Sequence, residues 1–237
     1  MYGAKGYTFL KSLEEKIALS EGRWKIKVLM PYNLSYNYVA AVELDDKTEG
    51  VLKLCMPGRE CDNEISALQA DRGTTMCGLI DYVREEGILL LEKLEPGSDL
   101  KSVNDEALAV EIACDLISQR KEVSIVPPTI SHQDERVDDL KRLLNYRDQF
   151  DVPFGDSIIK KVSQTLPMLI DTQGKCYFLH GDFHHENILS HGQRWKLIDP
   201  KGLIGEIECE IIPFLMNNLS PIFTGLLITG FQCLPIS

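Results

Sequence analysis

The spacing of hydrophobic residues in the first part of the chain changes from helical to extended. Leu10, Leu13 and Ile17 recur at helical spacing, which predicts a short opening helix with Thr8 as its N-cap and Gly22 as its end. A second helix is expected after the third of five strands. The alternation predicts strands over 24–30, 38–44, 50–55, 79–83 and 88–93, and a helix over 59–70. Short links between consecutive strands favour an antiparallel sheet.

The pattern becomes helical after the break at 96–98, where Pro, Gly and Ser follow one another. Apolar residues recur at intervals of three and four around 108–116, 137–144 and 157–170, which predicts three helices. Pro167 lies in the last of these, and we expect a kink or an early end there.

The order of these elements predicts two lobes and an α+β fold class. Residues 1–95 form the sheet-rich N-terminal lobe, and residues 96–237 form a mainly helical C-terminal lobe. The chain has 25 Lys and Arg against 36 Asp and Glu, a formal net charge of −11. This balance disfavours nucleic acid as a partner, because such surfaces cluster cations against phosphates. It suits a cationic small molecule.

Cysteine usage and the chain ends indicate a cytoplasmic protein. The seven cysteines include no C-x-x-C pair and predict reduced, mostly buried thiols. Residues 1–19 contain no apolar core of a signal peptide. Residues 211–237 are uncharged, but Pro213, Pro221 and Gly225 interrupt them, so we expect no membrane span. We make no prediction about the oligomeric state.

A histidine cluster raises the possibility of a metal site. Four of the five histidines lie between His180 and His191, and imidazole is a common ligand of zinc. One alternative is therefore a metal-dependent hydrolase. The spacing argues against it, because His180 and His184 share a face only on a helix, whereas Gly181 and Asp182 predict a loop after a strand over 176–179.

Asp182, Asn187 and Asp199 form the set that phosphoryl transfer requires. Two short strands, 188–189 and 195–198, are predicted to fold Asp199 back beside Asn187. Asp182 is the candidate base for the acceptor hydroxyl, and Asn187 with Asp199 are candidate ligands of Mg²⁺. Asp and Asn are also common turn residues, so the D-x-x-x-x-N pair taken alone favours an ordinary loop.

Lys53 and Glu64 add a second part of this set. Lys53 lies in the middle of an apolar predicted strand, where an unpaired Lys is unusual. Glu64 lies on the following helix and is a candidate partner, although an exposed strand Lys and a solvated helix Glu remain the alternatives. Their order relative to Asp182, Asn187 and Asp199 is that of kinase folds.

The chain resembles the aminoglycoside phosphotransferase superfamily, and within it the streptomycin 6-kinase branch of aminoglycoside/hydroxyurea resistance kinases. The resemblance rests on L-H-G-D-F-H-H-E-N-I-L over 179–189 and I-D-P-K-G over 198–202. The segment 87–94, followed by Pro96 and Gly97, is similar to the hinge between the family's two lobes. The resemblance covers roughly residues 24–210 and implies a protein-kinase-like fold.

This resemblance also implies roles for individual residues. Lys53 would contact the α- and β-phosphates of ATP, with Glu64 as its ion-pair partner and Glu60 as the alternative. Asp182 would be the catalytic base, and Mg²⁺ would be held by Asn187 and Asp199. His180 would orient the loop. Backbone groups from Glu92 to Leu94 would hold the adenine.

Two departures from the family's pattern accompany these expectations. The segment over the phosphates, 31–38, contains no glycine, so Ser35 and neighbouring N–H groups are expected to meet the phosphates. After Glu210 the uncharged tail does not resemble the family's C-terminal helices, which predicts a chain truncated at its C-terminus. The alternative to an active kinase acting on streptomycin is then a catalytically impaired, nucleotide-binding remnant.

Overall fold

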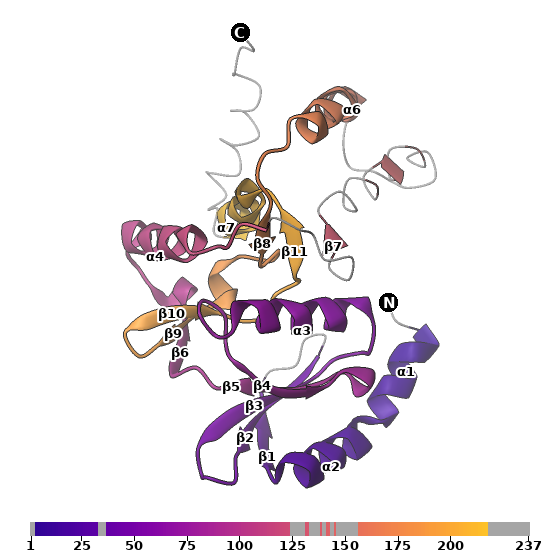
Figure 1. Cartoon of the computed structure of the whole chain (residues 1–237), viewed down its shortest axis with the longest axis vertical. Coiled ribbons are helices and arrows are strands. Elements are labelled where there is room, and N and C mark those ends of the chain that lie inside the picture. Colours follow the sequence, from indigo (N-terminus) through magenta and orange to yellow (C-terminus); the bar gives the residue numbers. More distant parts are fainter. Residues whose placement is uncertain are drawn as a thin grey trace.

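A computed structural model of the protein describes residues 3–32, 37–123, 131–132, 138, 141–142, 145 and 156–217 (Figure 1). Its first part is a five-stranded antiparallel sheet with the order β1-β2-β3-β5-β4. The strands are β1 Lys27–Pro31, β2 Tyr38–Glu43, β3 Glu49–Leu54, β4 Leu79–Val83 and β5 Ile88–Glu92. The helices are α1 Gly3–Lys11, α2 Leu13–Trp24 and α3 Arg59–Asp71.

Alternation along the strands divides the apolar side chains between the two faces of this sheet. Leu52 of β3 and Leu90 of β5 are buried in a cluster against which side chains of α1 and α2 pack. Leu89 and Leu91 of β5 lie in the cluster that contains Ile65 of α3. In Figure 1, α3 accordingly lies between the sheet and the rest of the molecule.

The N-terminal helix predicted from the sequence is in fact two helices. Thr8 lies inside α1 rather than at an N-cap, and Gly22 lies inside α2, which continues to Trp24. Lys25 then ends α2 in the left-handed conformation, which is one of the usual ways that a helix stops. The antiparallel sheet and the helix after its third strand are confirmed.

The second part of the chain contains helices and two small sheets. One sheet has the order β10-β9-β6 and the other β7-β11-β8. Their strands are β6 Pro96–Asp99, β7 Ser131–His132, β8 Tyr177–Leu179, β9 Ile188–His191, β10 Arg194–Leu197 and β11 Leu203–Gly205. The helices are α4 Glu106–Ser118, α6 Asp156–Asp171 and α7 Ile211–Asn217. Strands and helices are thus both present, and the α+β prediction is confirmed.

Several details of the second part differ from the prediction. Pro167 lies inside α6, which continues to Asp171, so the expected early end is wrong. Strands β6 and β11 were not predicted. The pattern does not indicate them because each is only three or four residues long and pairs with a distant segment. The helix expected over 137–144 falls largely outside the described residues.

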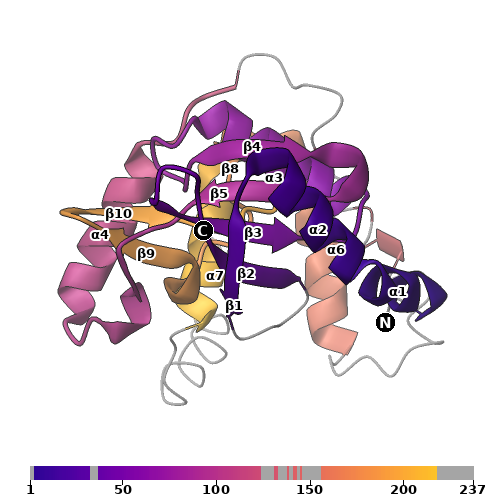
Figure 2. The same cartoon turned by 90° about the horizontal axis from the view of Figure 1, so that it is seen from below.

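The two parts meet through the segment between α3 and β4. Met76 forms a parallel bridge with Leu197 of β10, and the Cys77 N–H donates to the Leu197 carbonyl at 2.8 Å. Glu92 accepts a hydrogen bond from Lys196 of β10 at 2.7 Å. Seen from below, α4 and the β9–β10 hairpin lie on the opposite side of the molecule from α1 (Figure 2). The lobe boundary between residues 95 and 96 remains a prediction.

The cysteines only partly follow the expectation of reduced, buried thiols. Cys55 and Cys61 are buried as expected, and the structure places their sulfur atoms next to each other as a cysteine pair, which the sequence pattern did not indicate. Cys77 is buried, whereas Cys114 and Cys209 are exposed. In the part of the chain that the structure describes, no helix has the length and hydropathy to cross a membrane.

Candidate active site

Lys53 lies at the centre of the site because strand alternation turns it toward α3. Only 5% of the residue is exposed, and its Nζ is 2.6 Å from Oε1 of Glu64 on α3. The same Nζ contacts Oδ1 of Asp199. Glu64, and not the alternative Glu60, is therefore the ion-pair partner. One buried cation joins three segments that are far apart in the sequence.

Burial and charge act against each other at these three side chains. Burial by itself lowers the pKa of Lys53, but the charges of Glu64 and Asp199 outweigh it and raise that pKa above its ordinary value. Burial raises the pKa of Glu64, and the charge of Lys53 only partly offsets it. For Asp199 burial is outweighed by Lys53, so its pKa is lowered. At neutral pH Lys53 is a cation and Asp199 a carboxylate.

His180 connects the loop that carries Asp182 to the segment that carries Asp199. Its ring is fully buried, and burial lowers the pKa of His180 to about 3, so the ring is neutral. The Asp182 N–H donates to Nδ1 of His180 at 3.2 Å, which leaves the ring proton on Nε2. Nε2 then donates to the carbonyl of Ile198 at 2.8 Å.

Residues near the end of the described chain hold the loop that carries Asp182 in place. The buried carboxylate of Glu210 accepts hydrogen bonds from the N–H groups of His180 and Gly181, the latter at 3.1 Å. Phe214 of α7 stacks on the His185 ring with a centroid distance of 4.1 Å. The loop is thus held by residues that follow it in the sequence by about 30 positions.

Asn187 lies between the loop and the β9–β10 hairpin. The side-chain Nδ2 of Asn187 donates to the main-chain carbonyl of Asp182 at 3.0 Å. The main-chain carbonyl of Asn187 accepts from the Ile198 N–H at 3.0 Å. Asp199 follows with φ +61°, a left-handed conformation that is uncommon outside glycine and concentrated at functional sites. The structure therefore brings Asp182, Asn187 and Asp199 together.

The donor atoms at this site fit Mg²⁺. Nδ2 of Asn187 is held by the Asp182 carbonyl, so the amide oxygen is the atom left to coordinate a cation, together with the Asp199 carboxylate. Mg²⁺ prefers such oxygen atoms and takes its other ligands from water and phosphate. By contrast, no group of three or more His, Cys, Asp or Glu residues capable of holding a metal occurs among the described residues. The hydrolase alternative is not supported.

One cation near the two acids was not assigned a role from the sequence. Nζ of Lys201 lies 3.9 Å from Oδ2 of Asp182 and 3.7 Å from Oδ2 of Asp199. The signal was present, because Lys201 follows Asp199 by two positions in I-D-P-K-G. Spacing alone does not show that its side chain turns toward both acids.

The adenine contacts expected from the backbone of Glu92 to Leu94 remain a prediction, although one of the main-chain donors is already used. The Glu92 N–H donates to the Gly78 carbonyl at 2.8 Å and is therefore not available to a base. The Glu92 carboxylate accepts from Lys196 at 2.7 Å and from the Gly78 N–H at 2.8 Å. Leu94 is buried with 7% exposed, and the other backbone groups from Glu92 to Leu94 remain the candidates. Ser35 lies outside the described residues.

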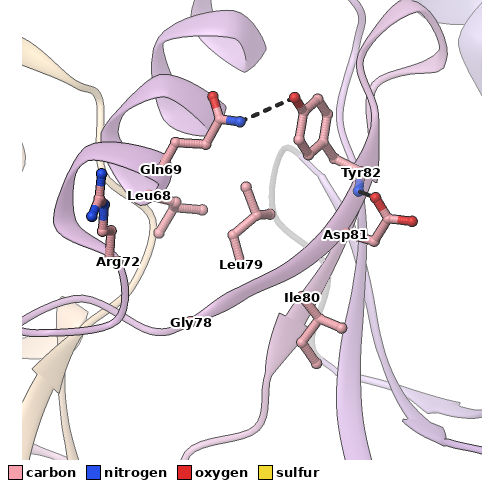
Figure 3. Close-up of a pocket in the computed structure, with 8 residues that line it drawn as sticks. All are labelled: Leu68, Gln69, Arg72, Gly78, Leu79, Ile80, Asp81 and Tyr82. Atoms are coloured by element: carbon pink, nitrogen blue, oxygen red, sulfur yellow. Dashed lines mark hydrogen bonds between the residues drawn. The ribbon is translucent and has the colours of Figure 1, made fainter.

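A cavity of about 360 Å³ lies elsewhere, between α3 and β4 (Figure 3). Gln69 of α3 donates to the hydroxyl of Tyr82 across it at 3.0 Å. Its lining residues are Leu68, Gln69, Arg72, Gly78, Leu79, Ile80, Asp81 and Tyr82. None of them belongs to the predicted phosphoryl-transfer set.

Comparison with known sequences identifies related proteins. Residues 26–220 match the family model for aminoglycoside/hydroxyurea antibiotic resistance kinases. The chain is similar to a streptomycin 6-kinase of Streptomyces griseus, with 27% identity over 90% of this chain and 70% of that protein. It is also similar to a hydroxyurea phosphotransferase of Kitasatospora aureofaciens, with 29% identity over 91% of this chain and 64% of that protein.

Solved structures agree on the fold. A choline/ethanolamine kinase family protein from Mesorhizobium loti superposes with a TM-score of 0.66 at 10% identity, covering 97% of this chain and 78% of that chain. The protein-kinase-like α+β fold is therefore confirmed. Because the family model matches most of the sequence, the chain belongs to the aminoglycoside/hydroxyurea antibiotic resistance kinase family, whose relatives are phosphotransferases.

Proposed function

We propose that the protein transfers the γ-phosphate of ATP to a hydroxyl group of a small cationic molecule, an aminoglycoside or aminocyclitol such as streptomycin. The observation that carries this proposal is the contact of Lys53 with both Glu64 and Asp199. Lys53 is 146 positions from Asp199 in the sequence, so the contact depends on the fold. It joins the predicted phosphate-binding side chain to a predicted Mg²⁺ ligand.

Each side chain has one part in the proposed reaction. Lys53 binds the α- and β-phosphates, and Glu64 keeps its ammonium in place. Asp182 orients the acceptor hydroxyl and takes its proton as the oxygen attacks the γ-phosphorus. Asn187 and Asp199 hold Mg²⁺, which supplies positive charge to the phosphate oxygens when it is bound. Most of the rate then comes from positioning and electrostatics.

Two observations support the proposed acceptor class. The chain carries a formal net charge of −11, which favours the approach of a cation. One relative is named as a streptomycin kinase and another as a hydroxyurea phosphotransferase. Streptomycin is strongly cationic and hydroxyurea is neutral, so activity on the two acceptors separates the charge argument from family membership alone.

The test is phosphate transfer from radiolabelled MgATP to streptomycin, with hydroxyurea and choline as further acceptors. Asp182→Asn retains the size of the side chain but removes the base, and we expect it to lower kcat by about 10²- to 10⁴-fold. Asp46→Asn is the matched control, because Asp46 lies at the exposed β2–β3 turn, where it accepts hydrogen bonds from Thr48.

Equal activity of wild type and Asp182→Asn above background would show that Asp182 is not the base. Wild type that binds MgATP but transfers phosphate to none of the acceptors would instead favour the catalytically impaired remnant. Transfer to hydroxyurea with none to streptomycin would contradict the cationic acceptor while leaving the phosphotransferase chemistry intact.

A further inference from the structure

The side chain of Lys201 lies between the two acids on which the proposed reaction depends. Its Nζ is 3.9 Å from Oδ2 of Asp182 and 3.7 Å from Oδ2 of Asp199. Both separations are too long for hydrogen bonds, and no hydrogen bond joins this Nζ to another described residue. The side chain is 45% exposed. Its three N–H donors are thus close to both carboxylates while remaining available to a ligand.

Close contacts fix the main chain at Lys201 and at the residue that follows it. The Lys201 N–H donates to the carbonyl of His180 at 2.7 Å. The next residue, Gly202, has φ +60°, and a Cβ there would lie 2.5 Å from the carbonyl oxygen of Asn63 on α3. The Lys201 main chain is therefore bonded to the loop that carries Asp182, and the residue that follows it lies against α3. The reach of Lys201 is set by the same contacts that place Asp182 and Asp199.

We propose that Lys201 is a further catalytic residue, whose ammonium contacts the transferring phosphoryl group. This inference rests on the proposed kinase function. The acceptor hydroxyl would lie at Asp182, and the phosphates would lie near Asp199, which would help to hold Mg²⁺, so the phosphoryl group would pass between these two carboxylates. Its negative charge is spread over three oxygens in the transition state. Without a cation, two nearby carboxylates would oppose that charge.

The position of Lys53 leaves this task open. Lys53 contacts Oδ1 of Asp199 and is held there by Glu64, whereas Lys201 approaches Oδ2 of the same carboxylate and also reaches Asp182. The two cations therefore lie on different oxygens of Asp199. Lys53 serves the α- and β-phosphates, and Lys201 serves the γ-phosphoryl group as it moves toward the acceptor.

Lys201 gives or takes no proton in this step. The bond between the γ-phosphorus and the oxygen that bridges it to the β-phosphate breaks, and its electron pair stays with ADP. The acceptor oxygen forms the new bond to phosphorus, and its proton moves to Asp182. The ammonium of Lys201 only stabilises the charge on the transferring oxygens.

The test compares Lys201→Met and Lys201→Arg with wild type in both nucleotide binding and phosphate transfer. We expect Lys201→Met to lower kcat by about 10²- to 10³-fold, as loss of one preorganised transition-state donor does. It should also weaken binding of Mg·AMP-PNP, which has a γ-phosphoryl group, about tenfold more than binding of Mg·ADP, which lacks it. Lys201→Arg, which keeps the charge, should restore part of both.

Lys175→Met is the control, because Lys175 is a surface cation that pairs with Glu122 at 2.7 Å. A purely structural role for Lys201 would weaken Mg·AMP-PNP and Mg·ADP binding equally, and that result overturns the inference, as does unchanged kcat. If wild type transfers no phosphate, the proposed function fails first. A selective loss of Mg·AMP-PNP binding would then still locate Lys201 at the γ-phosphoryl group.

Discussion

The residues of this site differ in how far their side chains are buried. Lys53 and Glu64 are nearly inaccessible, whereas the Asp199 side chain is 36% exposed. The buried pair is held by the sheet and by α3, so it keeps one geometry, while the exposed carboxylate remains open to ligands. A buried ion pair adds little net stability, but loss of one partner is costly because it leaves a buried charge.

The high cost of losing one partner of a buried ion pair predicts the effect of replacing Glu64. Glu64→Gln should cost less than the roughly 3–5 kcal/mol seen when a buried pair loses a partner, because Asp199 still contacts Lys53. It should nevertheless destabilise far more than Glu60→Gln, since Glu60 is exposed on the same helix. Urea unfolding measures both, and a MgATP titration should show weaker binding for Glu64→Gln only. Equal costs at the two positions would contradict the pairing.

Elements meet at the site through very close main-chain contacts. The residues just before β11 run beside α3, where Gly202 leaves no space for a side chain. The turn of the β9–β10 hairpin contains Gly192, which has a similar backbone, φ +59°, but among the described residues no atom lies within 4 Å of a Cβ built there. The two glycines have the same conformation and different surroundings, so they separate the cost of conformation from the cost of packing.

Alanine substitutions at these glycines should therefore differ in effect. Each carries the left-handed backbone penalty of about 1 kcal/mol, but Gly202→Ala must also displace α3 or the loop that carries Lys201. We expect Gly202→Ala to lower the urea midpoint by clearly more than Gly192→Ala, and to reduce phosphate transfer as well. Similar midpoints for the two variants would show that α3 yields easily at this contact.

At the scale of the whole molecule, the first part of the chain carries Lys53 and Glu64, and the second part carries the other residues of the candidate site. The bridge from Met76 to Leu197 and the hydrogen bond from Lys196 to Glu92 join the two parts next to the site. The buried, neutral ring of His180 bonds to the carbonyl of Ile198, the residue that follows Leu197. Its burial therefore affects the stability of the fold as well as the position of Asp182.

This burial predicts how stability depends on pH. The pKa of His180 is about 3 in the folded protein, against 6.5 for an exposed histidine in the unfolded chain, so between these values only the unfolded chain binds the proton. The free energy of unfolding should then fall as the pH is lowered from 6.5, by up to about 1.4 kcal/mol per pH unit. His180→Gln should show a shallower dependence in urea titrations from pH 7 to 5. An unchanged slope would contradict a neutral His180.

Short-range pattern predicted much of the site because some of its geometry is local. Alternation in β3 turns Lys53 away from Leu52 and Leu54, and the β9–β10 hairpin returns Asp199 to Asn187 within a dozen residues. The antiparallel sheet was predictable for the same reason, because its strands are marked by local alternation and joined by short links. The N-terminal helices were mispredicted because Gly22 is tolerated inside α2, where side chains packed against the sheet outweigh its weak helix propensity.

The sequence by itself determined the identities and order of the reactive side chains, the face of β3 that carries Lys53, and the return of Asp199 to Asn187, because these depend on neighbouring residues. Only the tertiary structure decided that Glu64 and not Glu60 pairs with Lys53, that Glu210 holds the His180 loop, and that Lys201 reaches both acids. Such contacts depend on how whole elements pack, and local spacing does not encode the relative placement of segments that are distant in the chain.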